Sequence, residues 1–343
     1  MDLSRRHFSL IAGSLLFAGR HARAEAPEPP EVRIVLAPSN LGLRPEDGKE
    51  PGTWQAPRVL MAAGLRHAVE AAEVMCLERP LYDFEAQPDT RMRNGQTLRK
   101  FSLELAETVR AALDAHRFPV VIGGDCGILL GCLYGLRLAG GRGLVHVDGH
   151  SDFAQAKSYA TPETLGADAG MDLALVSGRG EPIMTEWPGV DGPLAADADI
   201  VQVGERGRDD PGFMQYYGDI LATEITRVDV QDVLAEGIDA AARRVLARFE
   251  ARGLDRAWLH VDLDVLDEKV MPAVDSPGTP GFDYGQLSAL VGLLAASGRV
   301  AGMDFAIYDP ERDAGHAHAA GLVACIAAGV RPRRAPRSAP SRT

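Results

Sequence analysis

Short apolar runs alternate along the chain with longer segments in which apolar residues recur three or four positions apart. Runs such as FPVVIG (118–123) contain no polar residue, which is typical of strands buried on both faces of a parallel sheet. The longer segments, for example VQDVLAEGIDAAARRVLARFEAR (230–252), have the periodicity of amphipathic helices. The pattern predicts an α/β fold, specifically a three-layer α/β/α domain with a mostly parallel central sheet.

The alternation continues without an internal repeat or an interior linker, so we expect one domain over residues 31–330. In sheets of this kind, ligands bind beyond the carboxyl ends of the strands. Three predicted strands are followed by polar clusters, and we expect the functional site there. The predicted strands begin the segments 32–38, 118–125, 143–152, 199–206, 257–267 and 300–309, and the main predicted helices cover 56–72, 230–252, 284–297 and 314–328.

The two ends of the chain differ from this domain. Paired Arg5-Arg6 precede an apolar run and the small-residue pattern Ala22-Arg23-Ala24, which predicts a twin-arginine-type signal over residues 1–24. The apolar run is too short to span a bilayer. We therefore expect export to the periplasm or secretion, with no membrane association after signal cleavage. Residues 331–343 contain five Arg among Pro and Ser, which is typical of a disordered basic tail.

Charge and cysteine content narrow the function classes. The net charge of −12 argues against a nucleic-acid partner, since phosphate binding needs a basic face. Of the four cysteines, Cys76, Cys132 and Cys325 lie in apolar segments and are expected to be buried. Cys126 instead follows the strand end Gly123–Asp125, next to polar residues, and is a candidate functional group.

Aspartate and histidine residues gather at two further strand ends. Asp148, His150 and Asp152 alternate after one strand, and Asp262 and Asp264 after another. Residues two apart in an extended segment point to the same side, so each group faces one pocket. Carboxylates crowded there repel each other and lose hydration, a cost that bound divalent cations remove. The sequence therefore predicts a metal site.

These motifs resemble those of the ureohydrolase family, which includes arginases, agmatinases and formiminoglutamases. The family's Gly-Gly-Asp-His corresponds to Gly123–Cys126 and its Asp-Ala-His-x-Asp to Asp148–Asp152. Its Asp-x-Asp-x-x-Asp, followed by a Pro/Gly-rich segment, corresponds to Asp262–Asp267 with SPGTPG. The resemblance covers residues 31–330. It implies an arginase-like fold, a homo-oligomer (trimer or hexamer) and a two-manganese centre that hydrolyses a small linear amidine or guanidino substrate.

The resemblance also implies roles for individual residues. Asp148 and Asp262 would bridge the two metals, and Asp148 and Asp264 would be the catalytic carboxylates, with Asp264 handling the proton of the attacking water. The implied ligands of one metal are Cys126, Asp148, Asp152 and Asp262, and those of the other are Asp148, His150, Asp262 and Asp264.

Cys126 departs from the family histidine, and three interpretations follow. A thiolate ligand would shift the preference from Mn²⁺ toward Zn²⁺ or Fe²⁺. Alternatively, only the metal held by Asp148, His150, Asp262 and Asp264 would remain, as in the single-zinc site of related deacetylases. A Cys126 nucleophile is a third option, although the sequence offers no adjacent general base.

Two further positions depart from the family pattern. The proton-shuttling His of a His-Gly pair is replaced by Ala169, and the Glu that pairs with the substrate guanidinium is replaced by Ile307. His146 and His260 are expected deeper in the strands, in the core or behind the ligands, and His316 and His318 at the polar start of the last helix. Substrate specificity is expected in loops 39–55 and 153–168.

The sequence thus leads to one principal hypothesis and two alternatives. The principal hypothesis is a metal-dependent hydrolase of C–N bonds in linear amidines with a non-standard substrate. One alternative is a catalytically silent member of the family that binds metal or ligand. The other is a deacetylase-like amide hydrolase that uses one zinc ion.

Overall fold

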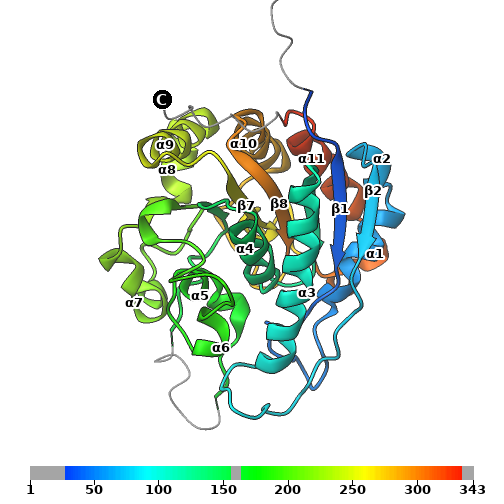
Figure 1. Ribbon diagram of the computed structural model, residues 1–343, viewed down its shortest axis with the longest axis vertical. Coiled ribbons are helices and arrows are strands. Elements are labelled where there is room, and N and C mark those ends of the chain that lie inside the picture. The colour runs from blue at the N-terminus through cyan, green and yellow to red at the C-terminus, as the bar shows by residue number, and fades with distance from the viewer. Residues whose placement is uncertain (1–27, 156–163, 334–343) are drawn as a thin grey trace, which may run out of the picture.

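A computed structural model describes residues 28–155 and 164–333 of the chain. Its centre is an eight-stranded sheet in the order β2-β1-β3-β8-β7-β4-β5-β6, and every neighbouring pair is parallel (Figure 1). The predicted α/β fold class is confirmed. The strands are β1 (Val32–Ala37), β2 (Glu73–Cys76), β3 (Phe118–Gly123), β4 (Leu144–Val147), β5 (Ile200–Val203), β6 (Thr226–Val228), β7 (Ala257–Asp262) and β8 (Val300–Ala306).

Helices cover both faces of this sheet, which explains why the central strands are buried along their whole length. Helices α3 and α4 pack together on one face, and α1, α11, α10 and α9 form a row on the other (Figure 1). The helices are α1 (Ala56–Ala62), α2 (Leu65–Ala68), α3 (Gly95–Asp114), α4 (Ile128–Leu138), α5 (Asp172–Val176), α6 (Pro182–Thr185), α7 (Pro211–Tyr216), α8 (Val230–Glu236), α9 (Ile238–Arg252), α10 (Tyr284–Ala296) and α11 (Ala319–Val330).

Two predicted helices are each divided in two. The segment 56–72 breaks at Gly64 and the segment 230–252 at Gly237, with φ of 96° and 88° respectively. A helix needs negative φ, and glycine adopts positive φ without steric cost. The helix expected over 314–328 begins as a short 3₁₀ turn, and α11 itself starts at Ala319. Apolar periodicity predicted the helical faces correctly but did not show these breaks.

Cys76 is exposed, which corrects the prediction that it is buried. It ends β2, the edge strand of the sheet, where β1 is the neighbouring strand. Cys132 and Cys325 are buried as predicted.

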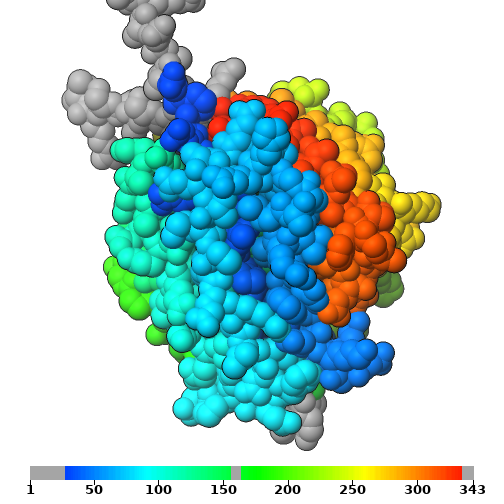
Figure 2. Space-filling view, turned by 90° about the vertical axis from the view of Figure 1, so that its right-hand side faces the viewer, coloured from blue at the N-terminus to red at the C-terminus, as the bar shows by residue number. Residues whose placement is uncertain are grey.

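The chain ends meet the body of the molecule on one side. The Arg333 Nε donates a hydrogen bond to the carbonyl of Pro30, and the Arg331 Nε to that of Ala68, each over 3.1 Å. Figure 2 shows the N-terminal segments, in blue, packed beside the red C-terminal helix α11. The predicted signal (1–24) and the rest of the basic tail (334–343) lie outside the described residues. Over the described ranges, no helix is both long and apolar enough to cross a membrane.

Candidate metal centre

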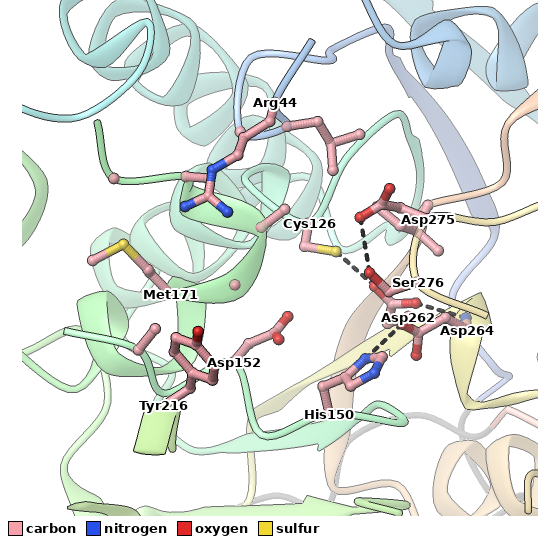
Figure 3. Close-up of a pocket in the computed structure, with 18 of the residues that line it drawn as sticks. Arg44, Cys126, His150, Asp152, Met171, Tyr216, Asp262, Asp264, Asp275 and Ser276 are labelled. Carbon is pink, nitrogen blue, oxygen red and sulfur yellow. Dashed lines mark hydrogen bonds and ion pairs between the residues drawn. The ribbon is translucent and has the colours of Figure 1, made fainter. Parts of the chain in front are cut away.

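The strand order brings the three predicted motifs together. β3, β7 and β4 lie near the middle of the sheet, with β8 between β3 and β7. Their carboxyl ends open into a cavity of about 600 Å³. Figure 3 shows Cys126, His150 and Asp152 pointing from different sides toward Asp262 and Asp264. All of these residues, together with Arg44, Glu46, Ala169, Met171, Tyr216, Tyr217, Asp275, Ser276 and Ile307, line the cavity.

His150 and Asp264 form the closest ion pair at the base of the cavity. The His150 Nδ1 lies 2.8 Å from the Asp264 Oδ2 and 3.8 Å from the Asp148 Oδ1. Burial opposes the charged ring, but the Asp264 carboxylate outweighs it and raises the pKa of His150 to about 9. Burial also opposes the ionised Asp264, yet His150 and Arg206 together hold the pKa of Asp264 below its ordinary value. Asp148, His150 and Asp264 place ligand atoms within 4.8 Å of one another, as a shared cation requires.

The sulfur of Cys126 contacts Asp262, another of the predicted metal ligands. Its Sγ lies 2.6 Å from the Asp262 Oδ2 and donates to it. Burial, reinforced by the Asp262 carboxylate, raises the pKa of the thiol well above its ordinary value. A neutral thiol is a weak nucleophile, so this environment counts against a Cys126 nucleophile and is compatible with a ligand that loses its proton to a metal.

The carboxylates of Asp148, Asp152 and Asp262 are all buried and close together. Burial and the neighbouring carboxylates raise the pKa of each one well above its ordinary value. Within the described part of the chain, the Asp148 Oδ2 has no hydrogen-bond partner. Such a buried, unsatisfied and mutually repelling set of oxygens fits divalent cations, which would replace the missing partners. Oxygen and imidazole donors suit Mn²⁺, whereas the Cys126 sulfur favours Zn²⁺ or Fe²⁺.

Arg206 is a counter-charge that the sequence motifs did not reveal. It follows β5, and its guanidinium donates a hydrogen bond to the backbone carbonyl of Asp264 and lies 3.8 Å from the Asp264 Oδ1. A Cβ at Gly149 would overlap this guanidinium. The family motif has alanine at that position, so the glycine and the buried arginine occur together for a steric reason.

A second buried polar group lies behind the predicted ligands. His146 and His260 are partners in the register of β4 and β7, and their rings stack with centroids 5.0 Å apart. The His260 Nδ1 lies 2.6 Å from the Asp304 Oδ2, and the His146 Nε2 lies 3.3 Å from the Asp172 Oδ1. Both histidines are buried behind the ligands, as expected. Sequence reasoning missed Asp172, whose only signal was a charged residue in the apolar helix DLALV.

The two positions at which this chain departs from the family pattern, Ala169 and Ile307, both line the cavity. Ala169 offers no group that could transfer a proton. Ile307 is buried and has φ of 74°, a conformation that a β-branched residue rarely adopts. Its N–H donates to the carbonyl of Gly124 over 2.7 Å, which helps to hold it there. The cavity wall is therefore apolar and strained at the position where the family has a carboxylate.

The cavity mouth comes partly from the loops expected to set specificity. Gly42–Arg44 and Glu46 belong to the loop 39–55. Ala154, Thr164, Gly166 and Ala167 belong to the loop 153–168, of which residues 156–163 lie outside the described ranges. Arg44 extends its guanidinium into the cavity (Figure 3). Tyr216 and Tyr217 also line it, at the end of α7, which no motif predicted.

The all-parallel α/β fold of this chain is similar to that of solved structures. The crystal structure of arginase from Bacillus caldovelox aligns with a TM-score of 0.74 and 24% identity, over 88% of this chain and 98% of that chain. Formimidoylglutamase from Bacillus subtilis aligns with a TM-score of 0.65 and 17% identity, over 90% of this chain and 88% of that one. At these identities, the likeness establishes the fold.

Sequence comparison identifies the family. A sequence model of the arginase family matches residues 31–330, and the chain belongs to that family. The arginase of Bacillus caldovelox is 28% identical over 301 residues, which cover 82% of this chain and 92% of that protein. The formimidoylglutamase of Nocardia farcinica is 29% identical over 290 residues, which cover 84% of this chain and 83% of that protein. The predicted ureohydrolase resemblance is confirmed. These relatives are hydrolases of C–N bonds in linear amidines.

Proposed function

We propose that this protein hydrolyses a C–N bond of a small linear amidine. The observation that carries the proposal is the meeting of Asp148, His150 and Asp264 within 4.8 Å at the base of a cavity in an arginase-family fold. A cationic amidine suits a cavity whose base is lined with carboxylates, because opposite charges attract more strongly where water is scarce.

The chain's own residues supply binding and proton transfer. Divalent cations held by Cys126, Asp148, Asp152 and Asp262, and by Asp148, His150, Asp262 and Asp264, would acidify water and stabilise negative charge at the reacting carbon. Asp264, which His150 and Arg206 keep ionised, accepts the proton of the water that adds to the amidine carbon. The same proton then passes to the leaving nitrogen as the C–N bond breaks, so that Asp264 returns to its ionised form.

The substrate class follows from Ala169 and Ile307. Ile307 provides no carboxylate for a guanidinium at the position where the family has one, and losing a buried charged partner of that kind costs several kcal/mol. We therefore place formimino compounds and other amidines with an apolar flank ahead of arginine or agmatine.

The test is a turnover screen of the purified protein, loaded in parallel with Mn²⁺, Zn²⁺ or Fe²⁺, against guanidino, formimino and acylamino compounds. We expect release of ammonia, formamide or urea from at least one amidine and its loss in Asp264→Asn. Metal binding without turnover of any compound would favour the silent alternative, which Ala169 and Ile307 support. Deacylation with one zinc ion would favour the deacetylase-like alternative.

The proposed role of Cys126 has its own prediction. Cys126→His should raise the manganese content by up to one equivalent per chain, because an imidazole replaces a ligand that prefers softer metals. The measurement is metal analysis after equilibration with equal Mn²⁺ and Zn²⁺, with Cys132→Ser as the control for a buried cysteine outside the cavity lining. Equal manganese in the wild type and in Cys126→His would contradict the ligand role.

We further propose export through residues 1–24 and assembly into a homo-oligomer. Replacing Arg5 and Arg6 by Lys in the full chain should retain the protein in the cytoplasm, because the paired arginines are the hallmark of the signal. Cell fractionation measures this, with a change at Arg20 as the control for lost charge. Light scattering of the processed protein gives the oligomer size, for which we expect a trimer or hexamer.

A further inference from the structure

A buried group of two histidines and one aspartate lies one layer beneath the predicted metal ligands. His146 and His260 precede Asp148 and Asp262 by two residues on β4 and β7, and Asp172 begins α5 opposite them. All three side chains are fully buried. One ligand atom of each residue lies within 4.8 Å of the other two.

The distances in this group leave room for a cation. The His146 Nε2 is 3.3 Å from the Asp172 Oδ1, and the His260 Nε2 is 3.7 Å from the Asp172 Oδ2. Two ligands that are each about 2.1 Å from a tetrahedral ion lie about 3.4 Å apart. The separation from His260 is too long for a hydrogen bond. Among the described residues, the His260 Nε2 and the Asp172 Oδ2 have no hydrogen-bond partner.

The other ring nitrogen of His260, Nδ1, contacts a carboxylate, as the second ring nitrogen of a metal-binding histidine commonly does. Its Nδ1 lies 2.6 Å from the Asp304 Oδ2, and the Asp304 Oδ1 accepts a hydrogen bond from the Trp258 Nε1 over 2.5 Å. A carboxylate at Nδ1 fixes the tautomer and leaves the Nε2 lone pair for a metal. Asp304 therefore holds the His260 ring so that its buried Nε2, which has no hydrogen-bond partner among the described residues, faces Asp172.

We propose that His146, Asp172 and His260 form an inner divalent-cation site, made of residues other than the ligand set at the cavity base. Two imidazoles and one carboxylate favour Zn²⁺, Fe²⁺ or Co²⁺ over Mg²⁺ or Ca²⁺. The site adjoins the outer set, because the Asp148 Oδ2 lies 3.5 Å from the His146 Nε2. This inner site does not depend on turnover of an amidine, and its ligands come from residues that the family motifs do not include.

The test measures metal stoichiometry in the full chain. Metal-free protein is dialysed against Zn²⁺ or Co²⁺ alone, and bound metal is counted by mass spectrometry. We expect Asp172→Asn and His146→Gln each to bind one equivalent less than the wild type. Asp168→Asn, a buried aspartate that lies outside the group, should keep the full count. His150→Gln should lose an outer equivalent and keep the inner one, so that combining it with Asp172→Asn lowers the count by two equivalents.

A wild-type measurement covers the case in which these variants fail to fold. In the cobalt-loaded protein, NMR should show paramagnetically shifted ring N–H signals from three histidines if both layers hold metal, and from one if only His150 binds. Wild-type stoichiometry in folded Asp172→Asn and His146→Gln, or a single shifted histidine, would overturn the inner site. Absence of turnover with the inner equivalent retained would reject only the proposed function.

Discussion

Gly149 and Arg206 depend on each other at the edge of the candidate centre. The Arg206 guanidinium occupies the space that a Cβ at position 149 would fill, and it reaches Asp264 through that space. The arginine therefore supplies positive charge to the carboxylates only because the motif contains glycine. The pair is the point at which this chain differs most directly from the family's Asp-Ala-His-x-Asp.

Gly149→Ala should destabilise the protein by about 1–3 kcal/mol, because the methyl group displaces a buried, charged side chain. The measurement is the free energy of unfolding from urea titration. In an Arg206→Ala background, the same change should cost less, since only the Asp264 carboxylate then lies against the added methyl group. An equal cost in both backgrounds would show that the guanidinium is not what excludes alanine.

Single residues were predictable where neighbours in sequence are neighbours in space. Asp148, His150 and Asp152 were found because alternate residues of one extended segment share a side. Arg206 and Asp172 were not, because each reaches the centre from another element, and no local pattern encodes that meeting. The exposure of Cys76 was missed for the same reason, since strand order decides which strand lies at the edge.

Among the elements, α10 has the most complete N-terminal cap. The Asp283 side chain accepts from the Gln286 N–H over 2.7 Å, and the Gln286 side chain accepts from the Asp283 N–H over 2.9 Å. This capping box satisfies two N–H groups that the first helical turn leaves unpaired. The helix packs between α9 and α11, away from the cavity.

Asp283→Ala should lower the free energy of unfolding by about 1 kcal/mol through loss of this cap. Metal content and turnover should stay at wild-type values, since α10 contributes no residue to the cavity lining. Thermal unfolding and metal analysis on the same samples provide both readouts. Asp283→Asn, which keeps an accepting oxygen, should restore most of the stability, and failure to do so would contradict the capping explanation.

Elements were well predicted in kind and less well in extent. Largely apolar runs identified the central strands, because burial on both faces leaves few polar residues in them. The apolar period continues through Gly64 and Gly237, so the pattern predicted continuous helices. At both glycines the backbone has positive φ, which ends one helix before the next begins. The short edge strand β2, with two exposed residues, carried no comparable signal.

For the molecule as a whole, the metal-free state should lose stability as pH rises. His150 has an ordinary pKa of 6.5 and a folded pKa of about 9, so its contribution is complete below pH 6.5 and lost through pH 9. The raised pKa values of Asp148, Asp152 and Asp262 act in the same direction, because folding disfavours their ionised forms. The pKa shift of His150 alone accounts for a loss of at most about 3 kcal/mol in the free energy of unfolding.

Urea titrations of metal-free protein between pH 6 and pH 9 measure this loss. His150→Gln should flatten part of the slope, and saturating Zn²⁺ or Mn²⁺ should remove most of it, since the cations then balance the carboxylates. A stability that rises with pH in the metal-free protein would contradict the charge arrangement described for the cavity base.

The contact between Arg333 and Pro30 has a practical consequence for handling the protein. Pro30 immediately precedes β1, so both ends of the described chain lie at the amino-terminal edge of a parallel sheet, whereas the cavity opens at the carboxyl-terminal edge. An affinity tag, a fluorescent fusion or a surface linker joined to the domain at Pro30 or at Arg333 would start on the side opposite the cavity mouth. Immobilised protein should therefore remain open to small molecules from solution.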